Sequence, residues 1–396
     1  MSSKSLLEYY QQNSFNPVPI PLEDRAAWES HFAKRHNLYE RHLGIPFSLL
    51  QNCSILEFGC NSGENALVLA CVGANLTLVE PNNQVLPQLK ALFQKFGVTE
   101  RITSLVTEGI DTFESDIAYD IVLAEGFLFA LPNRDRMVQK IGKLIKPGGL
   151  GVISFNDRYG CLLEMTRRMV AWRAYQLQGI DNVHSQAALN LAEKLFATDF
   201  SKLKASRSFE AWWKDTLINP FLASEYHWSY PELIPLLEQI GCEFYSSSPK
   251  WTAIDRFTWY KNVSESSQRH QQLTENLRMY LPFFLTGLPP SVGETSPASS
   301  AVIDSLTNLI KQLSDYTVNW GISIEEVIYP LLLDEYLSQS QDSRLRQFNT
   351  EMKDLYEAAK YNQLDGLIST YQASNCVRSM WGAPYHYICF SKRADS

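Results

Sequence analysis

A turn near residue 60 combines glycine, asparagine and acidic residues at a spacing that suits ligand binding. An apolar run from Ile55 to Phe58 leads into this turn, and a helical pattern starts after Gly63. Gly59 and Gly63 let the backbone approach a ligand and adopt dihedral angles that a side chain forbids. Asn61 is the kind of residue, other than glycine, that best tolerates a left-handed conformation. The N–H groups that open the following helix are then available to a ligand carboxylate.

The turn does not match the two common phosphate-binding loops. A dinucleotide fingerprint needs glycine at the third and sixth positions counted from Gly59, where the chain has Asn61 and Glu64. No Gly-Lys-Ser/Thr follows, so a P-loop is also absent. The ligand has to be inferred from what accompanies the turn.

An acidic residue ends the next apolar run, about 20 residues after the turn, as in Rossmann-type sites. This run is Leu76 to Val79, and Glu80 and Pro81 follow it. A carboxylate at this place binds both hydroxyls of a ribose. The alternative is that Glu80 is an ordinary strand-end acid exposed to solvent.

Short β-rich runs alternate with helical stretches around these two motifs. The predicted strands are Ser54–Phe58, Asn75–Val79, Ile102–Val106, Asp120–Ala124 and Leu150–Phe155. The predicted helices between them are Asn65–Cys71, Gln84–Phe96 and Arg134–Ile145. This alternation is typical of a parallel sheet with crossover helices. In such a sheet, ligands bind outside the carboxyl ends of the strands.

The order of the motifs resembles that of the class I methyltransferases, which use S-adenosylmethionine (SAM). Glu57 to Gly63 resemble the family's first motif, with Asn61 in place of its middle glycine, and Glu80 matches its ribose-binding acid. The segments that resemble the adenine-flanking loop, the fourth motif and the turn after the last helix are Glu108–Asp111, Tyr119–Gly126 and Leu144–Leu150. The resemblance implies SAM as the cofactor. The cofactor-binding residues that it implies are Glu57, Gly59, Cys60, Asn61, Gly63, Glu80, Pro81, Gly109, Ile110, Asp111, Ala124, Glu125 and Gly126.

The same resemblance implies an α/β fold, with a Rossmann-like seven-stranded, mostly parallel sheet, helices on both faces and large helical additions. The candidates for the family's sixth strand and its antiparallel seventh strand are Cys242–Ser246 and Tyr385–Phe390. The expected divisions of the chain are an N-terminal helical lid (1–50), the SAM-binding core (51–158), a helical and aromatic substrate-binding region that includes the sixth strand (159–260), a mostly helical insertion (261–380) and the returning seventh strand (381–396).

Three local signals lie outside this core. Pro17, Pro19 and Pro21 predict an irregular loop between two leading helices. Residues 286–300 predict a second loop, rich in Pro, Gly and Ser. Ser323 with Glu326 fits a capping box that opens a helix, and Pro330 should kink or end that helix.

Methyl transfer from a sulfonium is an in-line displacement, which requires alignment of the acceptor, exclusion of water and management of one proton. No metal is required, and no cluster of metal ligands stands out. Glu125 follows the fourth strand and is the first candidate to contact cofactor or substrate. Asp157 follows the fifth strand and is the second, with capping of the next helix as its alternative role. His227, between Tyr226 and Trp228, is the candidate general base because histidine titrates near neutral pH.

Other histidine and aromatic residues have two interpretations each. His31, His36 and His42 belong either to a lid over the site or to the surface and the helix caps. An aromatic group in the middle of the chain either lines an acceptor pocket or forms core. Its members are Trp212, Trp213, Phe221, Tyr226, Trp228 and Tyr230.

The composition disfavours several classes of partner. A net charge of −8 argues against a surface that follows nucleic-acid phosphates. No run approaches the roughly 18 apolar residues of a membrane span, and Met1 to Asn13 lack the pattern of a signal peptide. The seven cysteines are scattered without zinc-ligand spacing, which fits inert thiols in a reducing compartment. We therefore expect a cytoplasmic protein without a nucleic-acid or membrane partner, and the sequence leaves its oligomeric state open.

The leading hypothesis for function is metal-free methylation of an oxygen or nitrogen of a small organic acceptor, which large helical additions would enclose. Methylation of a peptide or protein is a second hypothesis. A non-catalytic subunit that binds SAM or a partner is a third. A transferase that uses decarboxylated SAM is a fourth, although the Gly59–Gly63 turn would then face no carboxylate.

Overall fold

The computed structural model describes residues 6–13, 24–203, 207–250, 259, 261, 266–289, 296–319 and 321–394. The loop predicted at Pro17, Pro19 and Pro21 lies outside the described residues, as does the middle of the loop predicted at 286–300. The chain divides into two compact units. Unit 1 comprises Met1–Phe155, Tyr230–His270 and His386–Ser396, and unit 2 comprises Asn156–Ser229 and Gln271–Tyr385.

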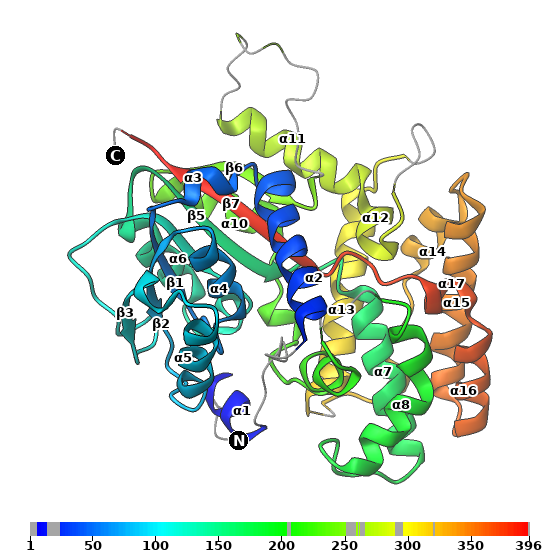
Figure 1. The fold of residues 1–396 in the computed structure, drawn as a ribbon. Helices are drawn as coiled ribbons and strands as arrows, with labels where there is room; N and C mark the ends of the chain where they lie inside the picture. Colours follow the sequence, from blue (N-terminus) through cyan, green and yellow to red (C-terminus); the bar gives the residue numbers. More distant parts are fainter. Residues whose placement is uncertain are drawn as a thin grey trace. The chain divides into compact units, whose positions relative to one another are not determined.

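Unit 1 contains a seven-stranded sheet with the order β3-β2-β1-β4-β5-β7-β6 (Figure 1). Strand β1 pairs in parallel with β2 and β4, and the pairs β2–β3 and β4–β5 are also parallel. Strands β6 and β7 pair antiparallel. The strands are β1 (Ser54–Phe58), β2 (Asn75–Val79), β3 (Ile102–Val106), β4 (Tyr119–Ala124), β5 (Ile145–Asn156), β6 (Cys242–Ser248) and β7 (Tyr385–Lys392). The predicted seven-stranded, mostly parallel sheet is therefore confirmed.

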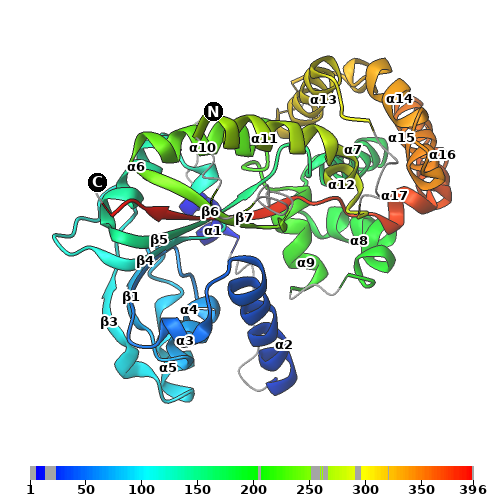
Figure 2. The same cartoon turned by 90° about the horizontal axis from the view of Figure 1, so that it is seen from above.

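Helices cover both faces of this sheet, as predicted. Figure 2 shows α6 and α10 on one side of the strands and α3, α4 and α5 on the other. The helices of unit 1 are α1 (Leu6–Gln12), α2 (Arg25–His36), α3 (Phe47–Leu50), α4 (Glu64–Cys71), α5 (Leu86–Lys95), α6 (Arg134–Leu144) and α10 (Tyr230–Gln239). Helix α11 (Ser266–Met279) continues from unit 1 into unit 2.

The core of unit 1 explains why these elements form where they do. Helix α4 is almost entirely apolar, and its residues from Ala66 to Ala70 are all buried. A helix without a polar face has to be covered on all sides, so α4 lies between the sheet and neighbouring helices. Buried side chains of β1, β2 and α5 complete the same cluster. This packing fixes the start of α4, and therefore the turn that precedes it, against the carboxyl end of β1.

Helix α2 has a side-chain cap at its start and continues at its end as a π-helix. The side chain of Asp24 accepts the N–H of Ala27 at 2.9 Å and so caps α2. The helix continues beyond His36 as a π-helical turn, Asn37–His42. Trp28 and Phe32 of α2 contact Phe96 and Phe47 respectively, with ring centroids 4.7 and 5.7 Å apart. These contacts attach α2 to the body of unit 1.

Unit 2 is helical. Its described helices are α7 (Leu162–Leu177), α8 (Gln186–Phe200), α9 (Phe209–Trp212), α12 (Leu281–Thr286), α13 (Ser300–Asn319), α14 (Leu331–Ser338), α15 (Ser343–Lys360), α16 (Leu364–Ala373) and α17 (Asn375–Ser379). An isolated bridge pairs Asp157 with Trp228. No described helix of the chain is long and apolar enough to cross a bilayer.

Helix α7 is the centre of unit 2, and it carries three buried arginines. Arg167 donates to the carbonyls of Val377 and Met380 at 2.7 and 2.6 Å. Arg168 donates to the carbonyl of Asn219 at 2.5 Å, and Arg173 donates to the carbonyl of Ala359, in the last turn of α15, at 2.8 Å. Carbonyl groups at the ends of helices lack backbone partners and carry partial negative charge. The arginines therefore tie several chain segments to one helix.

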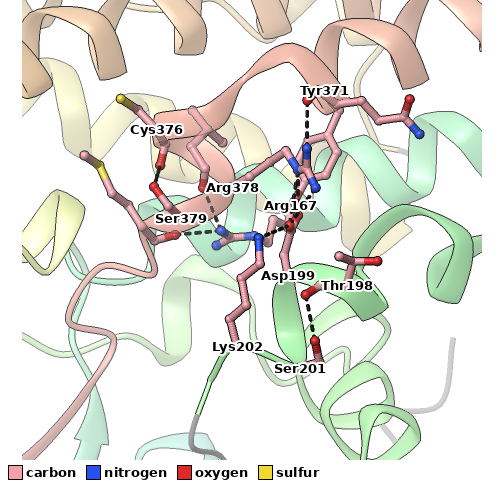
Figure 3. A network of polar contacts seen from close by, with 12 residues as sticks. Arg167, Thr198, Asp199, Ser201, Lys202, Tyr371, Cys376, Arg378 and Ser379 are labelled. Carbon is pink, nitrogen blue, oxygen red and sulfur yellow. Dashed lines mark hydrogen bonds and ion pairs between the residues drawn. The ribbon is translucent and has the colours of Figure 1, made fainter.

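A fully buried carboxylate connects α8 to the last helices of unit 2 (Figure 3). Asp199 accepts the hydroxyl of Tyr371 at 3.1 Å and the Nη2 of Arg378 at 2.9 Å. The guanidinium of Arg167 lies 4.0 Å from the centre of the Trp381 ring. Because a buried charge is costly unless it is paired and hydrogen-bonded, this network makes the packing of α16 and α17 on α8 specific.

The capping box at Ser323 and Glu326 is present, but the prediction for Pro330 is wrong. The box opens only a short 3₁₀ turn, Ile324–Glu326. Pro330 then stands at the N-cap of α14 and precedes a new helix. Proline is tolerated at the start of a helix, because the N–H that it lacks has no partner there.

Candidate functional site

The turn after β1 has the backbone conformation that its residue types predict. Gly59, Asn61 and Gly63 all have positive φ angles, of 68°, 49° and 88°. The N–H of Gly59 donates to the carbonyl of Val79 at 2.8 Å, which ties the start of the turn to the end of β2. Gly63 is the N-cap of α4. The chain therefore reverses tightly between strand and helix at the carboxyl edge of the sheet.

Glu80 stabilises this turn from the neighbouring strand. Its Oε2 accepts the N–H of Asn61 at 2.7 Å, and its Oε1 accepts the N–H of Asn82 at 2.8 Å. The side chain is buried, so the alternative of an exposed strand-end acid is excluded. Burial raises the pKa of this carboxyl, while the two N–H donors lower it. Each carboxylate oxygen keeps a second lone pair that can accept a hydroxyl.

The loop predicted to flank the adenine follows β3 in the chain and packs beside the last residue of β1. The N–H groups of Thr112 and Phe113 donate to the carbonyl of Gly109 at 3.2 and 3.0 Å, which forms a turn. The ring of Phe113 meets the ring of Phe58, the last residue of β1, at a centroid distance of 5.5 Å. Ile110 is buried, whereas Asp111 is exposed and its carbonyl accepts the Nζ of Lys140.

The residues after β4 come to the same edge. Ala124 pairs with Phe58 in the parallel ladder, so Glu125 and Gly59 follow adjacent strand ends. The N–H of Gly126 donates to Ser154 Oγ at 2.8 Å. Cys60 is also buried here, and burial raises the pKa of its thiol well above the ordinary value. That thiol therefore stays protonated and inert.

The Glu125 carboxylate is held by an arginine that sequence reasoning missed. Nη1 and Nη2 of Arg35, on α2, donate to Oε2 and Oε1 of Glu125 at 2.8 and 2.7 Å. The hydroxyl of Tyr39 lies 3.1 Å from Arg35 Nη2 and 3.4 Å from Glu125 Oε1. Nδ2 of Asn65, on α4, lies 3.5 Å from Glu125 Oε2. The side chains of Arg35 and Glu125 are each only 6% exposed.

Glu57, on β1, is a buried acid that interacts electrostatically with Glu125, Glu80 and Arg35. It is buried, and its Oε2 has no hydrogen-bond partner among the described residues. Burial, together with the nearby Glu125 and Glu80, raises the pKa of Glu57 to about 8, and the guanidinium of Arg35 opposes this shift. A buried acid without a partner is costly. A ligand with a cationic group or a hydrogen-bond donor would therefore be stabilised beside Glu57.

The family of this part of the chain follows from a comparison with known sequences. Residues 56–150 match a family model described as a methyltransferase domain. This segment is similar to a methyltransferase domain, and its sheet has the strand order that the resemblance to class I methyltransferases implies. The match contains the turn, Glu80, the loop at Gly109 and Glu125. The prediction of a SAM-dependent methyltransferase fold is confirmed for this part of the chain.

Relatives of the methyltransferase domain differ in what their names describe. The chain is 27% identical over 151 residues to sterol 4-C-methyltransferase strm-1 of Caenorhabditis elegans, covering 38% of this chain and 43% of the relative. It is 27% identical over 120 residues to a ubiquinone biosynthesis O-methyltransferase of Rickettsia akari, covering 30% of this chain and 44% of the relative. The chain thus spans less than half the length of these curated relatives. Among solved structures, the N-methyltransferase NodS of Bradyrhizobium japonicum, in complex with S-adenosyl-l-homocysteine, is 19% identical with a TM-score of 0.30, over 39% of this chain and 76% of that one.

The residues of the site fit SAM. When bound, SAM supplies an electrophilic methyl group on a positively charged sulfur. Its ribose hydroxyls suit the free lone pairs of Glu80, and its cationic groups suit the unpartnered Oε2 of Glu57. The positive φ of Gly59 and Gly63 lets the backbone form the tight turn beside which the cofactor would lie.

Two of the candidate catalytic residues lie together in unit 2. Asp157 is buried, and its Oδ1 accepts the N–H groups of Tyr159 and Gly160 at 3.0 and 2.8 Å, just before α7. Asp157 therefore closes a turn that precedes α7, whereas the N-cap of α7 is Cys161, without a side-chain cap bond, so the predicted capping of this helix by Asp157 is not observed. The bridge from Asp157 to Trp228 brings the segment of His227 beside it, and His227 is fully buried. A catalytic role for either residue stays a prediction.

The remaining histidine and aromatic candidates are dispersed. Burial and the adjacent Arg35 lower the pKa of His31 to about 4. His36 pairs with Glu40 at 3.2 Å, and His42 contacts Ser248 at 3.0 Å. The aromatic group also divides, because Trp212 packs with Phe200, Phe209 and Trp381 and Phe221 packs with Tyr226. Among the described residues, no group of three or more His, Cys, Asp or Glu side chains could hold a metal ion.

Proposed function

We propose that this protein transfers the methyl group of SAM to an oxygen or nitrogen of a small organic acceptor, without a metal. The observation that carries the proposal is the cradle in unit 1, in which Glu80 fixes the turn at Asn61 and Oε2 of Glu57 remains without a partner. Such a cradle binds and orients a cationic nucleoside donor. Methyl transfer then requires mainly that the acceptor is aligned and that water is excluded.

The residues of the chain have distinct roles in this proposal. Glu80 orients the ribose, and the turn from Gly59 to Gly63 leaves room for the amino-acid portion of the donor. Glu57 lies at the carboxyl edge of the sheet, where the sulfonium is expected, and a bound cation there favours its carboxylate form. Glu125 is paired with Arg35 at the same edge. His227 is the proposed general base that removes a proton from the acceptor, because a neutral imidazole accepts a proton near neutral pH.

A small organic acceptor is the class that the curated relatives favour. Their names are those of a sterol 4-C-methyltransferase and of a ubiquinone biosynthesis O-methyltransferase, and both refer to organic molecules rather than to proteins. The buried aromatic residues of unit 2 pack against one another as core, so they do not bear on the acceptor. The names of the relatives support an organic acceptor over a peptide.

An extract screen with an isotopically labelled methyl donor tests the proposal. Purified protein and labelled SAM are incubated with a small-molecule fraction and, separately, with a protein fraction of cell extract. We expect label in a product of low mass, and mass spectrometry with fragmentation then identifies the methylated atom. Label in protein alone would support a protein methyltransferase instead. Label on a carbon atom of the product would show that the methylated atom is neither oxygen nor nitrogen. Tight SAM binding with no labelled product from either fraction would favour the non-catalytic subunit.

A further inference from the structure

Arg35 and Glu125 form a buried ion pair at the carboxyl edge of the sheet. Glu57, Glu80 and Glu125 all belong to this edge, and both Glu125 and Glu80 contribute to the potential at Glu57. The positive charge of Arg35 acts against these negative charges at Glu57, and Nη1 and Nη2 of Arg35 both donate hydrogen bonds to Glu125. With both side chains 6% exposed, water screens their charges little. Removal of either charge therefore changes the potential at the carboxyl edge of the sheet, where the proposed function places the sulfonium.

The charge at this edge matters because the donor and the product differ in charge. SAM has a sulfonium, whereas S-adenosylhomocysteine (SAH), formed when the methyl group leaves, has a neutral thioether. The two molecules have the same ribose, adenine, ammonium and carboxylate groups. A change in the potential at the sulfur therefore alters the affinity for SAM and leaves that for SAH nearly unaffected, whereas general damage to the site weakens both.

We propose that Arg35 is a specificity-determining residue for the charge of the cofactor: by neutralising Glu125, it limits the preference of the site for SAM over SAH. Without Arg35, the buried acids would bind the sulfonium more tightly relative to the thioether. Without Glu125, the unopposed guanidinium would repel the sulfonium. This inference rests on the proposed function, and it assigns an electrostatic role to Arg35 of α2.

Opposite shifts in two matched variants test the proposal. Dissociation constants for SAM and SAH are measured by calorimetry for the wild type, Arg35→Gln, Glu125→Gln, the double variant and Arg35→Lys. The quantity compared is the ratio of the SAH constant to the SAM constant. We expect Arg35→Gln to raise this ratio about tenfold, which corresponds to ~1.4 kcal/mol. We expect Glu125→Gln to lower it by a similar factor, and both the double variant and Arg35→Lys to stay near the wild-type ratio.

Other roles of the ion pair predict different patterns. If the pair only holds α2 in place, both single variants weaken SAM and SAH together and the ratio stays constant. If Arg35 instead binds the carboxylate common to both ligands, Arg35→Gln weakens both equally. Either pattern would overturn the proposal. A variant that does not fold is replaced by Arg35→Met or Glu125→Leu in the same comparison, since the ratio depends on charge and not on the hydrogen bond.

Failure of the proposed function gives a separate result. If wild-type protein binds neither SAM nor SAH, the assignment of the cofactor site is wrong. If wild-type protein binds both ligands and the two single variants shift the ratio in the same direction, the site assignment holds and only the charge role of Arg35 is wrong.

Discussion

A Cβ atom placed on Gly59 would lie only 2.7 Å from the ring of Phe127. Gly59 follows β1 and Phe127 follows β4, so the segments after two adjacent strands are in contact across the cofactor cradle. Glycine at position 59 therefore has two functions: it adopts a φ of 68° and it leaves space for the phenylalanine. Phe127 in turn covers one side of the turn.

Gly59→Ala should weaken SAM binding at least tenfold, because the methyl group either displaces Phe127 or shifts the turn. Gly97→Ala is the matched control, since Gly97 has a φ of 65° but a Cβ atom placed on it would meet no atom within 4 Å. Both variants suffer the same backbone strain. Calorimetry with SAM should therefore show a loss for Gly59→Ala alone. Equal losses in both variants would show that general destabilisation by a strained alanine, and not the contact with Phe127, is responsible.

SAM binding should release a proton near pH 7. Because the pKa of Glu57 is raised to about 8 in the empty site, this carboxyl is mostly protonated at pH 7. A cationic ligand favours the carboxylate, so the proton leaves on binding and affinity rises between about pH 6 and 8, then levels off above the pKa. Calorimetry in buffers of different ionisation enthalpy measures this release. Glu57→Gln should abolish it, and a release that is unchanged in this variant would assign the proton to another group.

The sequence predicted the geometry of the turn and of Glu80 well, because backbone conformation and strand ends determine it. The turn at Gly59, Asn61 and Gly63 requires positive φ, and these residue types indicate that requirement locally. Glu80 was predictable because the end of one parallel strand lies next to the end of its neighbour. The two returning strands were also found in their predicted places, as β6 and β7.

Arg35 was missed because its partner is 90 residues away in the chain. A signal was present: Trp28, Phe32, Arg35 and Tyr39 follow helical spacing, so the arginine interrupts an apolar face. A cation on such a face is buried and needs a carboxylate.

The role of Pro330 could not be predicted from the sequence alone. A proline is compatible with the end of one helix and with the start of the next, and the packing of α14 determines that Pro330 precedes a helix.

Arg168→Met should destabilise unit 2 by about 3 kcal/mol, because buried carbonyls lose their donor. Arg168 is fully buried and donates to the carbonyls of Asn219 and Thr317. Arg346→Met is the control: Arg346 also donates to two backbone carbonyls, but it is exposed, so its loss should cost less than about 0.5 kcal/mol. Urea unfolding measures both values. Similar losses in the two variants would contradict a special role for buried arginines.

His227→Ala should lower the turnover number far more than the affinity for SAM, provided that the imidazole removes a proton from the acceptor. The comparison needs an acceptor from the extract screen and a matched variant, for which His184→Ala, on the α7–α8 connection, is suitable. Both variants should bind SAM as the wild type does. Unchanged turnover in His227→Ala would remove this residue from the mechanism.

The most direct test of the cofactor site is a SAM titration of wild-type protein and of Glu80→Gln, with Glu100→Gln as an exposed control. The amide has one acceptor oxygen, so it cannot accept both the N–H of Asn61 and the N–H of Asn82, and its NH2 group would face one of these donors. We expect one SAM per chain for the wild type, a loss of affinity of at least tenfold in Glu80→Gln, and no change in Glu100→Gln. Wild-type protein that does not bind SAM, or Glu80→Gln that binds it as tightly as the wild type, would contradict the assignment of this site.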